Sequence, residues 1–250
     1  MIELHNRAIL ITGASSGIGR QCAITCSQLG ASVALVGRNE ARLAETRALL
    51  SGDAHCVVAQ DLTDFDALGP TVSRVVEMIG PLSGFVHSAG ISIKLPLRLM
   101  TREQFEETFV VNVISAFEIA KHVQRKAHLA NRGASFVFIA SVMGRRGKPS
   151  LVAYCASKAA LTSGSRALAL ELASKRIRVN CVSPGAVKTC MLASSLEKLP
   201  PEAGRNILKA HPLGFGEASD VANAVAFLLS DAARWITGAD LAIDGGHSAQ

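Results

Sequence analysis

Residues 8–19 read AILITGASSGIG, an apolar run that leads directly into a glycine-rich turn. The run at 8–12 is short and continuous, as expected of a strand that is covered on both faces. After the turn, apolar residues recur every three or four positions from Ile18 to Leu29, which is the spacing of one helix face. The stretch therefore predicts a strand, a tight turn and a helix, the first unit of a parallel sheet.

The same alternation continues along the chain. We expect strands at 8–12, 32–36, 55–59, 84–87, 135–140, 177–182 and 240–243, separated by helices at 18–29, 40–50, 65–79, 101–128, 153–173 and 220–229. This pattern predicts the α/β class, as a single doubly wound Rossmann-like domain with about seven parallel strands and helices on both faces. No Pro/Gly/Ser-rich linker divides the sequence, so we expect one domain over 1–250. The irregular, proline-containing stretch at about 185–217 is interpreted as a mobile substrate loop or lid.

Composition excludes several classes of function. With 49% hydrophobic and 18% charged residues, the chain has enough apolar material for a large core. A net charge of +6 is spread along the chain and only 4% of residues are aromatic, so we expect no nucleic-acid partner. No apolar run has membrane-spanning length, the start does not resemble a signal peptide, and the six cysteines form no Cys-x-x-Cys. We therefore expect a cytoplasmic protein without a membrane partner or a metal site, since no His/Cys/Asp cluster has ligand spacing.

The glycine-rich turn has the spacing G-x-x-x-G-x-G. Glycines permit a tight turn and let a pyrophosphate approach the backbone, while the following helix directs its first N–H groups at that charge. The alternative is a purely structural turn, because a glycine trio alone is a weak signal. In the first strand-to-helix connection of an α/β chain we favour dinucleotide binding, by Gly13, Ser15, Ser16, Gly17, Ile18 and Gly19.

The end of the second expected strand carries Gly37-Arg38-Asn39, with no acid at that point. An NAD site would place a carboxylate there for the ribose 2′-OH, whereas a cation suits the 2′-phosphate of NADP. We therefore predict NADP(H), with NAD(H) kept open, because Arg38 could also be a solvated arginine or lie over an adenine. Asp61 could accept from the adenine amino group or cap the helix that begins near Asp64.

The chain's one tyrosine, Tyr154, begins the sequence Tyr-Cys-Ala-Ser-Lys at the start of a helix. Residues i and i+4 share a helix face, so Lys158 can approach the phenol and lower its pKa. Ser141 ends the preceding strand and could donate to a substrate oxygen, and Asn112 lies in an upstream helix. A lone Tyr-x-x-x-Lys is usually a surface pair, but the combination with the glycine turn is far more specific.

In this order, the glycine turn, Asn, Ser and Tyr-x-x-x-Lys resemble the short-chain dehydrogenase/reductase family of about 250 residues. The match extends to Asn-Cys-Val-Ser-Pro-Gly at 180–185 and to Asp-Gly-Gly at 244–246. The resemblance implies hydride transfer between a nicotinamide and a carbonyl carbon, with Tyr154 as the general acid/base and Ser141 orienting the carbonyl. It implies that Lys158 holds the ribose and tunes Tyr154, and that Asn112 anchors a water relay. Further cofactor contacts that it implies are Leu62, Ser88, Ala89, Gly90, Pro184, Gly185, Val187 and Thr189.

One motif departs from the family pattern. Where the family usually has Asn-Asn-Ala-Gly after the fourth strand, this chain has His87-Ser88-Ala89-Gly90. Ser88 is shorter than Asn, so a side-chain bond between the central strands can be lost. We interpret His87, at a strand end, as a structural histidine rather than a catalytic one.

The substrate is less clear from the residues. A cationic rim of Lys94, Arg98, Arg145, Arg146 and Lys148 could attract a carboxylate, a phosphate or an acidic carrier protein, or could simply keep the loops soluble. Arg132 and Lys175 fall at positions similar to basic residues beside the pocket of 3-oxoacyl-carrier-protein reductases. Carrier-linked 3-oxoacyl reduction is therefore the leading specific hypothesis. Dehydrogenation of a sugar, steroid, polyol or other small alcohol is the alternative.

A non-catalytic dinucleotide-binding regulator is the alternative of another class. The intact Ser141, Tyr154 and Lys158 argue against it. Small residues on several faces of the 153–173 helix, together with the family resemblance, lead us to expect a homotetramer.

Overall fold

The computed structural model describes residues 2–197 and 200–249. Within these residues one sheet of seven parallel strands has the order β3-β2-β1-β4-β5-β6-β7. The strands are β1 (Ala8–Thr12), β2 (Ser32–Gly37), β3 (Cys56–Ala59), β4 (Leu82–His87), β5 (Ala134–Ile139), β6 (Ile177–Pro184) and β7 (Asp240–Ile243). The expected doubly wound α/β sheet is thus confirmed.

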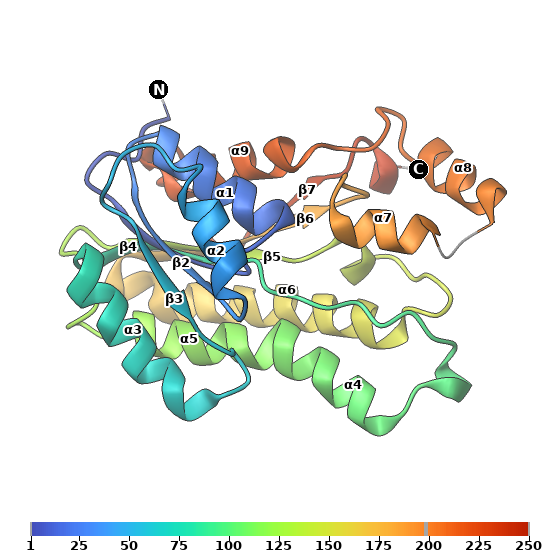
Figure 1. Cartoon of the computed structure of the whole chain (residues 1–250), viewed down its shortest axis with the longest axis horizontal. Helices are drawn as coiled ribbons and strands as arrows, with labels where there is room; N and C mark the ends of the chain where they lie inside the picture. Colours follow the sequence, from blue (N-terminus) through green and yellow to red (C-terminus); the bar gives the residue numbers. More distant parts are fainter. Residues whose placement is uncertain (1, 198–199, 250) are drawn as a thin grey trace.

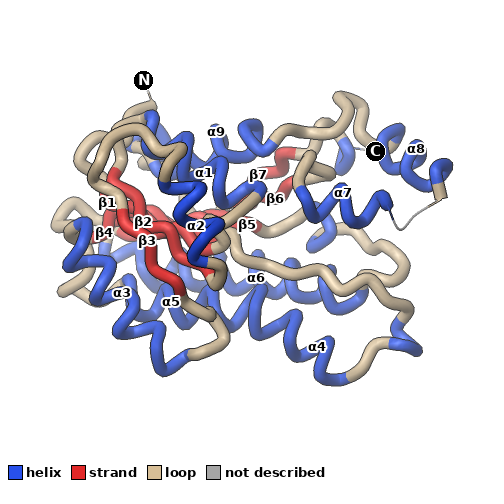
Figure 2. The backbone as a smooth tube through the Cα atoms, in the orientation of Figure 1, coloured by secondary structure: helices blue, strands red, loops and turns tan. Residues whose placement is uncertain are grey.

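Helices cover both faces of the sheet, as Figures 1 and 2 show. One face carries α1 (Gly17–Gln28) and α9 (Ala218–Leu229), and the other α3 (Phe65–Ile79), α5 (Ser115–Val123) and α6 (Val152–Leu172). Alternate side chains of β1 serve the two layers: Leu10 packs on the α3 side, and Ile9 and Ile11 pack on the α1 side. Because both faces are buried, the strands read as continuous apolar runs.

The chain reverses its direction of winding between β1 and β4. β2 and β3 lie on one side of β1, and β4 to β7 follow on the other. In open parallel sheets the crevice outside the carboxyl ends of strands at such a reversal is the usual ligand site. The loops that follow β1 and β4 therefore border the expected ligand site.

The region 101–128, expected as one long helix, is divided. α4 (Arg102–Phe109) runs into a π turn, Val110–Ile114, and α5 then ends at Val123. Apolar periodicity cannot reveal a π turn, because the insertion shifts the helix face without breaking the backbone pattern. Outside 185–217, the other described elements are α2 (Glu40–Arg47) and short 3-10 turns at Leu97–Leu99, Val142–Gly144, Ala173–Lys175, Asp231–Ala233 and His247–Ala249.

The stretch 185–217 contains two helices, α7 (Cys190–Glu197) and α8 (Pro201–Lys209), which project beside the sheet (Figure 1). Its two ends are joined by backbone bonds, from Lys188 N to the Gly216 carbonyl at 2.8 Å and from Gly216 N to the Ala186 carbonyl at 3.0 Å. The segment is thus a flap with a closed base. Across the described part of the chain, no helix is both long and apolar enough to cross a membrane.

Candidate active site

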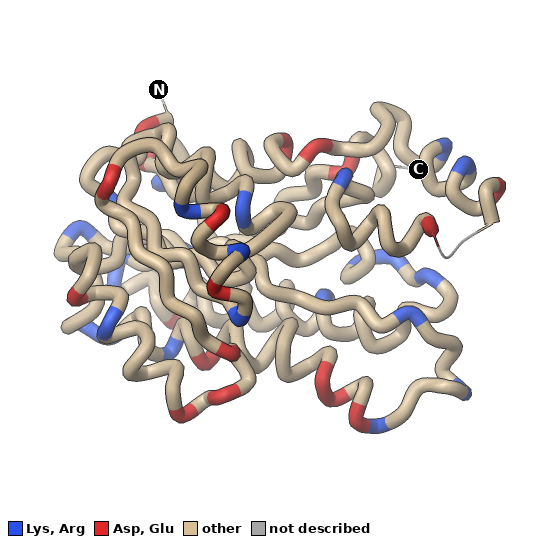
Figure 3. Tube along the Cα trace, viewed as in Figure 1, with Lys and Arg blue, Asp and Glu red and all other residues tan. Residues whose placement is uncertain are grey.

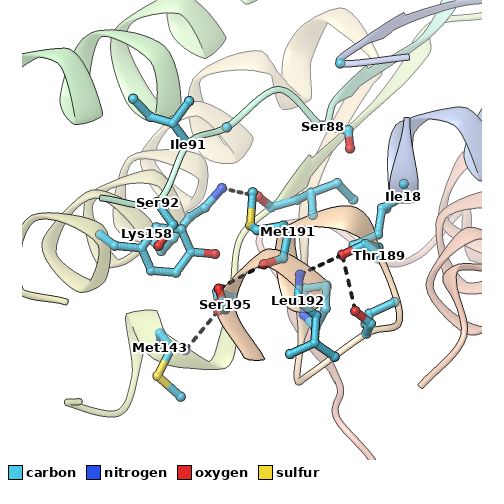
Figure 4. A pocket seen from close by; sticks show the side chains of 18 of the residues that line it. Ile18, Ser88, Ile91, Ser92, Met143, Lys158, Thr189, Met191, Leu192 and Ser195 are labelled. Atoms are coloured by element: carbon cyan, nitrogen blue, oxygen red, sulfur yellow. Dashed lines mark hydrogen bonds between the residues drawn. The ribbon is translucent and has the colours of Figure 1, made fainter. Parts of the chain in front are cut away.

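A cavity of about 1190 Å³ lies along the carboxyl edge of the sheet. It runs from the turn after β1 to the inner side of α7 and α8, and Figure 4 shows part of its lining. The expected site residues that line it are Gly13, Ser15, Ser16, Gly17, Ile18, Arg38, Asp61, Leu62, Ser88, Ala89, Gly90, Ser141, Tyr154, Lys158, Pro184, Gly185, Val187 and Thr189. Gly19 and Asn112 do not line it, and each supports a lining segment from behind.

The glycine turn is shaped by close backbone contacts. Gly13 has φ +64°, and a Cβ there would lie 2.7 Å from the Ala89 nitrogen. A Cβ on Gly19 would collide with the Gly13 carbonyl oxygen, so Gly19 permits the turn to close rather than contacting a ligand. Behind the turn, Arg20 donates to the Ser15 carbonyl at 2.8 Å, and Thr46 donates to the Ala14 carbonyl at 3.0 Å. Arg20 and Thr46 thus brace the glycine turn through its backbone carbonyls. They belong to no sequence motif, and the sequence analysis did not identify them.

Two arginines line the end of the cavity beside β2. Arg38 follows the strand, and Arg42 lies in the first turn of α2, whose N-cap Asn39 accepts from the Arg42 nitrogen at 3.0 Å. Asp61 lines the same end and accepts from the backbone and hydroxyl of Thr63, both at 2.9 Å. These bonds and the Arg38 charge hold the pKa of Asp61 below its ordinary value.

The helix after β3 is capped by a different residue from Asp61. Asp64 accepts from the Ala67 nitrogen at 3.3 Å and is the N-cap of α3. The capping alternative for Asp61 is therefore wrong. Asp61 lines the cavity, so the adenine contact stays a prediction.

The end of β4 is joined to β1 through Thr12. The Thr12 hydroxyl accepts from the Ser88 nitrogen at 3.2 Å and lies 3.1 Å from Nδ1 of His87. His87 is fully buried, and burial, with a smaller contribution from the Lys158 charge, lowers its pKa to about 3. The imidazole is neutral at physiological pH and does not line the cavity, which agrees with the structural interpretation of His87. Thr12 therefore links the carboxyl ends of β1 and β4 through its contacts with His87 and Ser88.

Tyr154 and Ser141 meet in the middle of the cavity. Ser141 starts the turn after β5, where its hydroxyl accepts from Met143 N at 3.1 Å. Tyr154 lies in the first turn of α6, so both side chains come from rigid elements. Burial raises the pKa of the Tyr154 phenol, and a hydrogen bond with Ser141 partly opposes that rise. The phenol is therefore protonated at neutral pH in the chain alone.

Lys158 lies one turn further along α6 and is almost fully buried. Its Nζ donates to the Ile139 carbonyl at 2.7 Å and lies 5.9 Å from the centre of the Tyr154 ring. Burial lowers the pKa of Lys158 to about 8. In the chain alone burial dominates at the Tyr154 phenol and the Lys158 amine is directed at the Ile139 carbonyl, so the lowering of the phenol pKa expected in the nicotinamide complex stays a prediction.

Asn112 sits in the π turn, fully buried behind the cavity. Its side chain accepts from Ile91 N at 2.8 Å and donates to the Ile91 carbonyl and to Ser157 Oγ, both at 3.0 Å. It thereby ties the loop after β4 to α6. π turns recur at functional sites because they re-aim side chains in this way. Asn112 thus positions the lining of the cavity and does not face it.

A dinucleotide fits this arrangement. The cavity is long, the closed glycine turn brings bare backbone to its surface, and the amino end of α1 adds N–H groups there. Arg38 and Arg42 line the cavity end beside β2, and a buried lysine lies near the phenol. Among residues 2–197 and 200–249, no group of His, Cys, Asp or Glu has metal-binding geometry.

The family model described as enoyl-(acyl carrier protein) reductase matches residues 13–248. The chain belongs to the short-chain dehydrogenase/reductase family. It is 34% identical to 3-oxoacyl-acyl-carrier-protein reductase FabG of Thermotoga maritima, over 98% of this chain and 99% of that one. It is 36% identical to L-xylulose reductase of Caenorhabditis elegans, over 98% and 97%.

Solved structures of this family agree. A 7α-hydroxysteroid dehydrogenase complexed with NADH and 7-oxo glycochenodeoxycholic acid has a TM-score of 0.90 at 30% identity, covering 98% of this chain and 95% of that one. A putative short-chain alcohol dehydrogenase of Sinorhizobium meliloti 1021 has a TM-score of 0.94 at 34% identity, covering 100% and 99%. The protein is thus an NAD(P)-dependent oxidoreductase of the short-chain dehydrogenase/reductase family, and its relatives act on different ketones and alcohols.

The placement of the basic residues differs from what the sequence suggested. Arg132 and Lys175 precede β5 and β6, at the amino ends of the strands and opposite the cavity. Arg132 donates to the Asn6 carbonyl and Lys175 donates to the Gln124 side chain. The expectation that they lie beside the pocket of their own chain is wrong, because both residues precede their strands and the cavity lies at the carboxyl ends of the strands. Lining residues that the sequence analysis missed include Asn39, Arg42, Gln60, Ile207, His211 and His247.

Proposed function

We propose that the protein is an NADP(H)-dependent oxidoreductase that interconverts a ketone and a secondary alcohol, with Tyr154 as general acid and base. The observation that carries the proposal is the position of the Tyr154–Ser141 pair in the same cavity as the closed glycine turn. A protonated phenol beside a hydroxyl donor is arranged to bind and protonate a carbonyl oxygen.

The chain's residues divide the work. The glycine turn and the amino end of α1 hold the pyrophosphate, and Lys158 holds the nicotinamide ribose. When bound, the dinucleotide supplies the hydride for reduction and accepts it in oxidation. Ser141 donates to the substrate oxygen and fixes its orientation. Tyr154 gives its Oη proton to that oxygen in reduction and takes it back in oxidation, while Asn112 positions the loop at Ile91.

Phenylalanine at position 154 tests the assignment. Tyr154→Phe removes one hydroxyl and should bind NADPH with unchanged affinity, while turnover across a panel of ketones and alcohols falls at least about a hundredfold. Ser141→Ala should lower turnover by less, because it orients rather than supplies the proton. Activity that persists in Tyr154→Phe would show that the proton donor is another group. NADPH binding without turnover of any panel member by the natural chain would favour the regulator.

The preference for NADP(H) is supported by Arg38 and Arg42, two cations at the ribose end of the cavity. The two guanidinium groups can hold a phosphate dianion more strongly than a hydroxyl. Arg38→Ala and Arg42→Ala should each lower the NADPH/NADH affinity ratio about tenfold or more. Arg74→Ala, on the exposed side of α3, is the matched control. An unchanged ratio in both test variants would point to NAD(H).

For the specific substrate we retain carrier-linked 3-oxoacyl reduction, supported by the names of several relatives at about 34% identity. The positions of Arg132 and Lys175 do not add to it within one chain. L-Xylulose reductase and carbonyl reductase [NADPH] 2 among the relatives keep small sugars and carbonyls as alternatives. Turnover of 3-oxobutanoyl thioesters on a carrier protein, compared with xylulose, steroid and simple ketones, distinguishes them.

We also propose a homotetramer. β7 is an edge strand, and two large apolar side chains, Leu170 on α6 and Trp235, are 80% and 96% exposed in the single chain. A second copy of this chain is the proposed cover for these two side chains. Light scattering at working concentration should give four times the chain mass of 26.2 kDa, and a monomer would refute the proposal.

A cytoplasmic location is supported by the cysteines, all six of which are free thiols. Cell fractionation of the source organism tests this, and recovery of the protein in a secreted fraction would contradict it.

A further inference from the structure

The substrate end of the cavity is lined by three cations. Lys94 comes from the loop after β4, and Arg146 and Lys148 come from the loop after β5. Of the cavity-lining residues in the described chain, the one carboxylate is Asp61, at the Arg38 end. Neither loop contains an acidic residue, and Figure 3 shows blue without red along both.

These cations are held together by the fold. The two loops are joined by a bond from Leu95 N to the Ser150 carbonyl at 3.0 Å. Arg146 donates to the His247 carbonyl, which fixes the guanidinium against the C-terminal segment. Burial, and then the charge of Lys94, lower the pKa of Lys148. Within the described residues, no carboxylate lies in ion-pair range of any of the three.

Two other loop cations show what an ordinary solubilising residue looks like here. Arg145 turns away to Asp240, with Nη2 2.6 Å from Oδ2. Arg98 is exposed, as Lys94 is, but unlike Lys94 it does not line the cavity. Lys148, by contrast, is half-buried beside Lys94 without an acidic partner, which disfavours the folded chain. A half-buried, unpaired ammonium in the reaction cavity lowers folding stability. Such a charge is explained if it binds an anionic group of the substrate.

Apolar side chains from α7 and α8 also line the cavity. Met191 and Leu192 come from α7 and Ile207 comes from α8, and Figure 4 shows Met191 and Leu192 on the same side of the hollow. Such a lining suits methylene groups between the reacting carbon and the charge.

We infer that Lys94, Arg146 and Lys148 form a subsite for an anionic group on the substrate. The substrate is then a ketone or secondary alcohol that carries a carboxylate or phosphate at the end of a short aliphatic segment. The inference rests on the proposed oxidoreductase function and names the class of its substrate. The anion has two possible sources, a free keto acid or the phosphate of a phosphopantetheine arm, and the chemistry of recognition is the same for both.

Matched substrate pairs test the subsite. With NADPH, we would compare keto acids with two to six methylene groups against their methyl esters, and 3-oxobutanoyl phosphopantetheine against 3-oxobutanoyl pantetheine. In at least one pair, the charged member should have a kcat/KM about tenfold higher. A preference among keto acids identifies a free substrate, and a preference confined to the second pair identifies the phosphate. Equal kcat/KM in every pair that is turned over would overturn the inference and leave the oxidoreductase proposal standing.

Variants locate the effect. Lys148→Gln and Lys94→Gln should each lower the charged/neutral ratio of kcat/KM about fivefold or more. Arg98→Gln removes the same charge from the same face outside the cavity and should leave the ratio unchanged. If Arg98→Gln lowers the ratio as much as Lys148→Gln, the effect is long-range attraction, and the subsite is refuted.

A binding measurement tests the anionic subsite without requiring turnover. The NADP⁺-loaded protein is titrated calorimetrically with hexanoate and with hexanamide, which differ in charge and little in shape. Hexanoate should bind about tenfold more tightly, and the difference should vanish in the Lys94→Gln/Lys148→Gln variant. Equal affinities, or a difference that survives in that variant, would refute the subsite even if no substrate is known. Failure of the proposed function would instead appear as an absence of turnover across the whole panel.

Discussion

Replacing Lys158 by methionine should abolish activity and make the nucleotide-free protein more stable near neutral pH. The Lys158 ammonium is buried in the cavity wall, with the Ile139 carbonyl at 2.7 Å as its hydrogen-bond partner. Methionine has a similar length and no charge, so Lys158→Met removes the buried cation and leaves the packing of α6 nearly intact. The variant therefore separates the contribution of Lys158 to activity from the effect of its buried charge on the free energy of unfolding.

The size of the effect follows from the pKa. Burial lowers the pKa of Lys158 from 10.5 to about 8, a difference of 2.5, which corresponds to about 3 kcal/mol. Below about pH 8 both the folded and the unfolded chain hold the proton, so the natural protein bears the full cost of the buried charge. Between about pH 8 and 10.5 the unfolded chain binds more protons than the folded one, so folding stability rises with pH. Loss of the bond to Ile139 should reduce the gain in Lys158→Met by about 1 kcal/mol, to about 2 kcal/mol at pH 7.

Urea denaturation from about pH 7 to 10 measures this. The free energies of unfolding of the two proteins should differ most near pH 7 and should converge as the pH rises. Titration of the buried cysteines and of Tyr154 is common to both proteins and largely cancels in the difference. Lys126→Met, at an exposed lysine, is the control and should run parallel to the natural chain. A Lys158→Met protein that is less stable at pH 7, or a difference that stays constant with pH, would refute the reasoning.

Three further predictions concern the glycine turn, the π turn and the phenol. Gly19→Ala places a methyl group against the Gly13 carbonyl and should weaken NADPH binding at least about tenfold in a fluorescence titration, whereas Gly204→Ala, with ordinary contacts, should not. Asn112→Ala breaks three hydrogen bonds and should lower the free energy of unfolding by about 1–3 kcal/mol in a denaturation experiment. In steady-state kinetics kcat should fall by a larger factor than the KM for NADPH changes. An unchanged kcat would show that Asn112 has a purely structural role. Because the pKa of Tyr154 is raised, reduction should be constant through neutral pH and fall only in alkaline solution while oxidation rises, and a pH–rate profile in which reduction already falls between about pH 6 and 7 would contradict this.

The fold was predictable because local and global signals agree in this chain. Strands covered on both faces give apolar runs such as Ala8–Thr12, and the helices between them have regular apolar faces. The prediction of secondary structure failed where apolar periodicity carries no information about the local backbone. The division of 101–128 depends on the π turn, and the short helices at 190–197 and 201–209 show little in the sequence beyond Pro200 and Pro201.

The site was predictable to the extent that its residues lie at strand ends. Ser141, Ser88 and Thr189 follow strands β5, β4 and β6, and parallel strands bring their carboxyl ends to one edge. Asn112 was identified through a motif, but its role as a buried tie between Ile91 and Ser157 needs three-dimensional contacts. The braces Arg20 and Thr46 contact backbone oxygens, for which a sequence carries no signal.

Positive charge is concentrated at the two ends of the cavity. Cations line both ends, Arg38 and Arg42 at one and Lys94, Arg146 and Lys148 at the other. The middle holds the Tyr154–Ser141 pair, with the neutral His87 buried behind it. Both ends attract anions, so charge alone cannot tell a nucleotide phosphate from an anionic substrate. Discrimination must come from shape: the closed glycine turn admits a pyrophosphate against bare backbone, whereas Met191 and Leu192 present an apolar wall. A ligand with a single charge and an aliphatic segment matches the second end alone, and this is why the anionic subsite can coexist with a dinucleotide in one crevice.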